Sequence, residues 1–105
     1  MYPDVCVWFR KILWEKYRDA EIHVENTSRK ILSKWLVERR LHNLFPDYQT
    51  YEIEVDITGI IERDGEAHLG MIECKLNQIT LSDLSQLLGY SRVALPVHSI
   101  ILSPK

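Results

Sequence analysis

The sequence predicts a small α/β domain in which helices flank a mixed β-sheet. Two observations support this fold class: apolar residues recur at helical spacing through the first half of the chain, and the period changes to two from Tyr51 onward. A chain of 105 residues is the size of one domain. We expect residues 1–24 to form an N-terminal helical extension and residues 25–105 to form the core, in the order α-α-β-β-α-β.

Two helices are expected in the first half of the chain. Asp4 is a suitable N-cap for the first helix, and Asn26 or Thr27 is suitable for the second, which should run to about residue 44. The segment 22–24 between them is short and ambiguous, and Pro46-Asp47 is a turn signal. The apolar stripes comprise Val5, Trp8, Phe9, Ile12, Leu13 and Tyr17 in the first helix and Ile31, Leu32, Trp35 and Leu36 in the second.

The second half is expected to form a hairpin, a helix and a strand. Apolar and polar residues alternate from Tyr51 to Ile61, and Asp64-Gly65 is a strong signal for a two-residue hairpin turn. The second strand is expected over residues 66–76. A third helix is expected over residues 80–94, with Thr80 as its cap and Asp83 completing a pair similar to a capping box. Residues 97–102 are expected to form a last short strand. The helix should turn one side toward the core, made of Leu81, Leu84, Leu87, Leu88 and Ser91.

The hairpin predicts which charged residues meet. If the turn has two residues, the numbers of paired residues sum to 129, so Asp56 faces Glu73 and Glu54 faces Lys75. Like charges directly opposite each other are unfavourable unless a cation lies between them, and Lys75 or a divalent metal ion would serve. Oxygen ligands of this kind suit Mg²⁺ or Mn²⁺. The alternative is a solvated ladder of opposite charges, which is the usual meaning of Glu-x-Lys on a strand.

Val55-Asp56, followed by a hairpin and Glu73-Cys74-Lys75, resembles the PD-(D/E)xK nuclease superfamily over about residues 25–103. The resemblance implies a restriction-endonuclease-like core and Mg²⁺- or Mn²⁺-dependent hydrolysis of DNA. It implies that Asp56, Glu73 and the backbone of Cys74 hold the metal, and that Lys75 acts on the attacking water. Val55 stands where many members of the family have a proline.

Further residues follow from the same resemblance. Gln86 and Tyr90 are similar to the Gln-x-x-x-Tyr motif of RecB-like members, and both are expected on the side of the third helix opposite the leucines. An upstream helix often supplies another acidic ligand in that family, which implies Glu25 or, as the rival, Glu38. A homodimer is expected, because a core this small offers little area for DNA and cutting both strands needs two sites.

The charge balance narrows the ways in which nucleic acid can bind. Lys and Arg number 13 against 15 Asp and Glu, a net charge of −2, which argues against a protein that coats nucleic acid by bulk charge. Positively charged residues cluster instead around the second helix. This basic face is either simply solvated or a surface that binds the phosphate backbone of nucleic acid. The residues concerned are Arg29, Lys30, Lys34, Arg39 and Arg40.

Other residue types give no further site. Cys6 and Cys74 are expected to be reduced, partly apolar residues rather than a disulfide. The histidines show no pair at helical ligand spacing, so no zinc site is expected among His23, His42, His68 and His98. No apolar run reaches the length of a membrane helix, and the N-terminus does not have the pattern of a signal peptide, so we expect a cytoplasmic protein.

Overall fold

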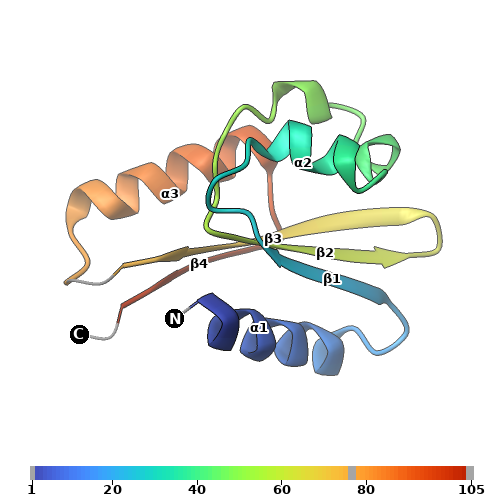
Figure 1. Cartoon of the computed structure of the whole chain (residues 1–105), viewed down its shortest axis with the longest axis horizontal. Helices are drawn as coiled ribbons and strands as arrows, with labels where there is room; N and C mark the ends of the chain where they lie inside the picture. The colour runs from blue at the N-terminus through green and yellow to red at the C-terminus, as the bar shows by residue number, and fades with distance from the viewer. Residues whose placement is uncertain (1, 76–77, 104–105) are drawn as a thin grey trace.

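The computed structural model describes residues 2–75 and 78–103 and has helices on both faces of a four-stranded sheet (Figure 1). In chain order the elements are α1 (Tyr2–Lys16), β1 (Glu21–Asn26), α2 (Leu32–Glu38), the 3₁₀ helices η1 (His42–Leu44) and η2 (Tyr48–Thr50), β2 (Ile57–Arg63), β3 (Glu66–Cys74), α3 (Leu81–Ala94) and β4 (His98–Leu102). α1 covers one face of the sheet, and α2 and α3 cover the other. The chain is therefore a small α/β domain with a mixed sheet, as the sequence predicts.

The sheet has the strand order β1-β2-β3-β4, with antiparallel pairing except between β3 and β4, which are parallel. The predicted hairpin register is confirmed, because Arg63 pairs with Glu66 and the pairing continues to Ile57 and Ile72 with the same sum of residue numbers. Asp64 and Gly65 both have positive φ angles, 55° and 79°, as a tight hairpin turn of this kind requires. The local turn thus sets the alignment of the two central strands.

The expected order α-α-β-β-α-β is wrong, because residues 21–26 form a strand, β1, that pairs with β2. The second helix begins at Leu32 rather than near residue 27. Thr27 does not cap it: its buried hydroxyl donates to the Val55 carbonyl oxygen at 2.6 Å and lies 2.7 Å from the Thr58 hydroxyl. The helix also ends at Glu38, well before residue 44, and Arg40 then takes a positive φ of 58°.

The hairpin strands are shorter than expected. The first begins at Ile57 rather than Tyr51, and Glu54, which we expected opposite Lys75, forms an isolated bridge with Ile31 instead. The segment before β2 contacts the start of α2 instead of β3: the Leu32 N–H donates to the Ile53 carbonyl oxygen at 2.8 Å. The second strand ends at Cys74, and its expected end at residue 76 lies outside the described residues.

Each face of the sheet carries its own apolar core. On the α1 side, Phe9 and Leu13 are buried against apolar residues of three strands, namely Val24, Ile57, Ile61 and Ile72. Gly59 permits this close approach, since a Cβ atom there would lie 2.8 Å from the Phe9 ring and 2.9 Å from Leu13 Cδ1. Residues 1–24 thus contribute to the core, and the boundary we placed between residues 24 and 25 falls within β1.

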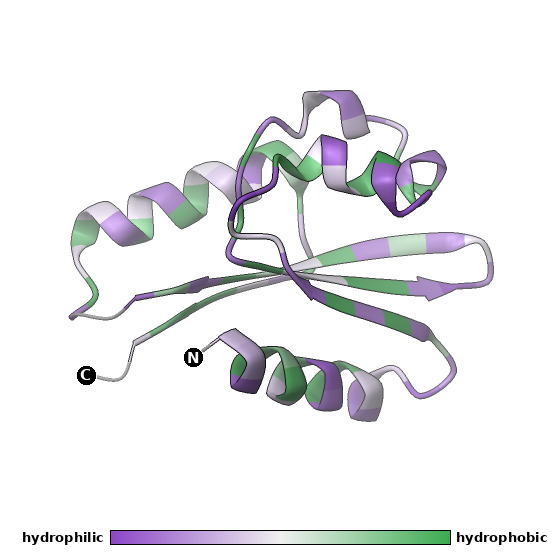
Figure 2. Ribbon diagram, viewed as in Figure 1, coloured by the Kyte–Doolittle hydropathy of each residue, from purple (hydrophilic) through white to green (hydrophobic). Residues whose placement is uncertain are grey.

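The opposite core lies beneath α2 and extends to α3. Its buried residues include Leu32, Trp35, Leu36, Phe45, Tyr51, Ile60, Leu69, Met71 and Ala94. Figure 2 shows the hydropathy along the strands; β2 and β3 are buried continuously over residues 57–61 and 69–73, as expected where helices cover both faces of a sheet. Among the described residues, no helix has both the length and the apolar character needed to cross a membrane.

The expected core face of the third helix is correct for Leu87 and Ser91 and wrong for the other three leucines. Leu87 is buried, whereas Leu81 and Leu88 are 80% and 61% exposed. The helix is rotated so that Leu87 and Ala94 face inward and Ser91 Oγ lies 2.7 Å from Ser99 Oγ of β4. The orientation of the helix thus follows its contacts with the sheet edge, and several leucines remain on the surface.

Candidate functional site

Asp56 and Glu73 meet at one end of the two central strands. Asp56 directly precedes β2, and Glu73 is the penultimate residue of β3. The Asp56 N–H donates to Glu73 Oε1 at 3.1 Å, and the Cys74 N–H donates to Asp56 Oδ2 at 2.8 Å. Each carboxylate therefore reaches the strand of the other. We call Asp56 and Glu73 the acid pair.

The environment of the acid pair disfavours negative charge on Glu73, whose side chain is buried. Burial raises the pKa of Glu73 to about 7, and the charge of Asp56 adds to this increase. The Asp56 N–H and the ammonium group of Lys75 act in the opposite direction. Near neutral pH, Glu73 is thus poised between its neutral and charged forms, and a cation bound beside it would favour the charged form.

The negative charge of the acid pair also affects the pKa values of Tyr2 and Cys74. Burial raises the pKa of the Tyr2 phenol, and the charge of Asp56 together with a hydrogen bond to Asp56 raises it further. Burial also raises the pKa of the Cys74 thiol to about 11, again with contributions from Asp56 and Glu73. Both groups are therefore neutral at pH 7. Sequence reasoning missed Tyr2, because no pattern links the first turn of α1 to residue 56.

Lys75 lies next to the acid pair in the chain but pairs with α3. Its side-chain Nζ is 2.9 Å from Asp83 Oδ1. Its backbone N–H donates to the Leu102 carbonyl oxygen at 2.8 Å. The hydrogen bond and charge of Asp83 raise the pKa of Lys75, and the charges of Glu73 and Asp56 also favour its protonated form. The Lys75 side chain is therefore a cation at neutral pH that is bound to α3.

Asp83 itself was expected only as part of a helix cap. That cap is confirmed, because Asp83 Oδ2 accepts from the Thr80 N–H at 2.9 Å and Thr80 Oγ1 accepts from the Asp83 N–H at 3.2 Å. Its second oxygen binds Lys75, and the hydrogen bond from Lys75 lowers the pKa of Asp83. One carboxylate thus joins the start of α3 to the end of β3.

Gln86 and Tyr90 lie further along α3 and bind each other. Gln86 Nε2 donates to the Tyr90 hydroxyl at 2.8 Å, which confirms that the two are neighbours. Tyr90 packs against the core beneath α2, so its expected position on the side away from the core is wrong. Within the described part of the chain, neither side chain is hydrogen-bonded to the acid pair.

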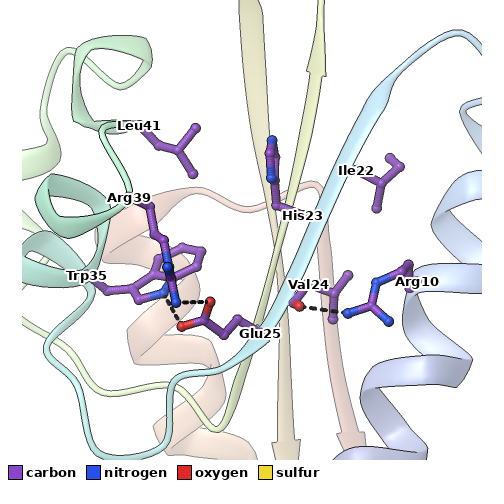
Figure 3. Close-up of a pocket in the computed structure, with 8 residues that line it drawn as sticks. All are labelled: Arg10, Ile22, His23, Val24, Glu25, Trp35, Arg39 and Leu41. Carbon is purple, nitrogen blue, oxygen red and sulfur yellow. Dashed lines mark hydrogen bonds and ion pairs between the residues drawn. The ribbon is translucent and has the colours of Figure 1, made fainter.

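The expected helix carboxylates are engaged elsewhere. Glu25 lies on β1 rather than at a helix start, and it accepts a hydrogen bond from Trp35 Nε1 at 2.8 Å while pairing with Arg39 at 2.6 Å (Figure 3). Burial would raise the pKa of Glu25, but the hydrogen bonds from Arg39 and Trp35 hold it below its usual value. Glu38, the alternative, pairs with Lys30 at 3.3 Å.

The basic residues around α2 form a mixed-charge surface. Arg29, Lys34, Arg39 and Arg40 are exposed, whereas Lys30 is half-buried. Three of the five line a cavity of about 280 Å³ together with two carboxylates; its lining includes Arg29, Lys30, Lys34, Trp35, Glu38 and Glu54. Part of the positive charge is thus neutralised by neighbouring carboxylates.

The structure brings Asp56, Glu73 and Lys75 together at one end of the sheet, joins Asp83 and Tyr2 to them, and ties Glu25 to α2. These contacts define a negatively charged site with the Lys75 ammonium group beside it. No protein-family model matches the chain, and no curated protein and no solved structure matches it either.

Proposed function

We propose that the protein is a metal-dependent nuclease that hydrolyses DNA phosphodiester bonds. The observation that carries the proposal is the acid pair, in which two carboxylates are held side by side and one of them is buried with a pKa of about 7. Such a pair is unfavourable without a cation. Mg²⁺ and Mn²⁺ prefer oxygen ligands, and Mg²⁺ is usually held by one or two carboxylates, which is the number the acid pair supplies.

The residues of the site have separable roles in this reaction. Asp56 and Glu73 would hold the metal ion, which when bound lowers the pKa of a coordinated water and polarises the phosphate. Lys75, kept protonated by Asp83, would stabilise negative charge on the scissile phosphate and orient the attacking water by donating a hydrogen bond. The raised pKa of Lys75 argues against its acting as the base.

The arrangement of the elements supports a relationship to the restriction-endonuclease core. The acid pair lies on an antiparallel hairpin, and α3 then leads to β4, which runs parallel to β3. This is the hairpin, helix and strand that the PD-(D/E)xK resemblance implies. We propose that β2, β3, α3 and β4 are the equivalent of that core.

The proposal is tested by metal binding and cleavage with matched variants. Wild-type protein should bind Mg²⁺ or Mn²⁺ and cut at least one of single-stranded, duplex and branched DNA. Glu73→Ala should lose both activities, whereas Glu66→Ala, at an exposed position on the same strand, should retain them. If wild-type protein neither binds these ions nor cuts any of the substrates with Mn²⁺ present, the proposal is wrong.

A second candidate is a catalytically inactive DNA-binding or assembly module of the same fold. The ion pair between Lys75 and Asp83 favours it, because it draws the ammonium group toward α3. Glu25 is also occupied by Arg39. Such a module would bind DNA with the same affinity in EDTA and in Mg²⁺ and would leave it intact, whereas a nuclease would cut it only with the ion.

We also propose that two copies associate, because cleavage of both DNA strands needs two sites. The exposed leucines of α3 provide an apolar surface for this contact; they are Leu81, Leu84 and Leu88. Sedimentation equilibrium should show a dimer for wild-type protein and a monomer for Leu88→Glu. A wild-type protein that stays monomeric at high concentration would exclude this arrangement.

A further inference from the structure

A second group of potential metal ligands lies near the opposite end of the β1–β2 pairing. Glu21 and His23 are two residues apart on β1, so they project to the same face, and Glu62 of β2 pairs directly with Glu21. Their potential ligand atoms all lie within 4.8 Å of one another. His23 Nε2 is 3.6 Å from Glu21 Oε1 and 3.7 Å from Glu62 Oε2. We call these residues the strand-end triad.

The electrostatics of the strand-end triad favour a cation between its members. Glu21 and Glu62 are like charges at directly opposed positions of an antiparallel pair, which is unfavourable. His23 Nε2 is buried and has no hydrogen-bond partner in the described structure, although the ring as a whole is 36% exposed. A nitrogen that faces two carboxylate oxygens beyond hydrogen-bond distance leaves room for an ion coordinated by all three.

We propose that Glu21, His23 and Glu62 bind a divalent transition-metal ion, with Zn²⁺ as the preferred occupant. In a tetrahedral zinc site with metal–ligand distances of about 2.0–2.2 Å, ligand atoms are about 3.3–3.5 Å apart. The two observed separations exceed this by a few tenths of an ångström. The oxygens of Glu21 and Glu62 lie within 4.8 Å of each other, and the Glu21 side chain is 69% exposed, so it has room to turn toward a shared ion.

The chemistry of the strand-end triad differs from that of the acid pair. An imidazole ligand suits zinc and its neighbours in the first transition row, whereas oxygen-only sites suit Mg²⁺ and Mn²⁺. β1 separates the two sites, since Glu21 is five residues from Asn26, or about 17 Å along a strand. His23 also lines the cavity of about 460 Å³ drawn in Figure 3, so its ring borders an open space. Three protein ligands leave a fourth position for water.

The histidine pattern of the sequence gives no sign of this site, because His23 is the only histidine in it and one of its two carboxylates comes from another strand. A bound ion would join Glu21, the first residue of β1, to Glu62 of β2, two residues that are far apart in the sequence. It would therefore hold the edge strand β1 in register with β2, and its fourth coordination position would bind a water molecule.

Zinc titration of the purified protein tests the proposal. Isothermal titration calorimetry at pH 7.5 should show one saturable Zn²⁺ site in wild-type protein, and Co²⁺ should give visible absorption bands of a low-symmetry site. His23→Ala and Glu62→Gln should each weaken Zn²⁺ binding at least tenfold. His68→Ala, which removes an exposed imidazole of β3, and Glu73→Gln, at the acid pair, should leave it unchanged.

Circular dichroism should first establish that each variant is folded. The proposal is overturned if wild-type protein shows no saturable Zn²⁺ binding, or if both His23→Ala and Glu62→Gln bind Zn²⁺ as tightly as wild type. It is also overturned if Glu73→Gln alone abolishes binding, because the ion would then belong to the acid pair. These outcomes do not depend on nuclease activity, so the two sites succeed or fail separately.

Discussion

Glu73→Gln should change the pH dependence of stability in a defined direction. Glutamine has the shape of protonated glutamic acid, and its amide oxygen can still accept the hydrogen bond from the Asp56 N–H. The pKa of Glu73 is about 7 in the folded protein, against an ordinary value of 4.5. The folded state thus binds the proton more tightly than the unfolded state. The corresponding stability is fully present below pH 4.5 and is lost as the pH rises through 7.

The magnitude follows from the difference in pKa. About 2.5 units at 1.36 kcal/mol per unit gives about 3 kcal/mol. In a metal-free buffer, Glu73→Gln and wild type should therefore be about equally stable near pH 4.5. Near pH 8.5 the variant should be more stable by about 3 kcal/mol, which for a domain of this size is roughly 12–24 °C in Tm.

Thermal unfolding followed by circular dichroism at a series of pH values in EDTA measures this effect. Glu66→Gln, at an exposed position on the same strand, is the control and should follow the wild-type curve. Addition of Mg²⁺ at pH 8.5 should then raise the Tm of wild type and leave that of Glu73→Gln unchanged. The reasoning is refuted if the Tm curves of Glu73→Gln and wild type remain parallel between pH 4.5 and 8.5.

Four further substitutions test the packing and the polar contacts. Gly59→Ala should lower stability by about 1–3 kcal/mol, because its Cβ would overlap Phe9. Gly89→Ala, on an open helix surface, should raise stability by about 0.5–1 kcal/mol. Urea unfolding measures both changes. Thr27→Val should cost about 1–3 kcal/mol, since the Val55 carbonyl oxygen would lose its buried donor, and an unchanged urea midpoint would contradict this. Asp83→Asn should lower the pKa of the Lys75 ammonium group in an NMR titration, and an unchanged value would mean that the ion pair does not form in solution.

The parts of the fold that depend on local sequence could be predicted. The hairpin register follows from Asp64-Gly65, because these two residues adopt the positive φ angles of the turn and so determine every pair beyond it. The cap at Thr80 follows in the same way from Asp83, three residues later. In both cases the residues that decide the structure are near neighbours in the chain.

The parts that depend on distant contacts could not be predicted. Residues 21–26 form a strand only because β2 lies alongside, and their short alternation does not by itself exclude a loop. The rotation of α3 depends on its contacts with β4, so the leucine-rich side of the helix was mistaken for its buried side.

In the candidate site too, local sequence predicts some contacts and distant packing decides the others. The meeting of Asp56 and Glu73 follows from the hairpin arithmetic, whereas the partners of Lys75 and Glu25 are decided by tertiary contacts with α3 and α2. The Tyr2 ring reaches the acid pair only through the packing of α1 on the sheet. Sequence reasoning therefore located the carboxylates and left their surroundings undetermined.

The pairing of the strands also orders the events of folding. The β2–β3 hairpin joins neighbouring segments, whereas Glu21 and Glu62 are 41 positions apart and β4 returns to β3 only after α3. Closing such long loops costs entropy before any contact is gained, so the hairpin should form early and the edge strands late. Gly65→Ala, which strains the turn, should mainly slow refolding, and Thr27→Val, between β1 and α2, should mainly speed unfolding in stopped-flow measurements. The outer strands would then be the first to detach from a folded molecule, and the turn the last structure to open.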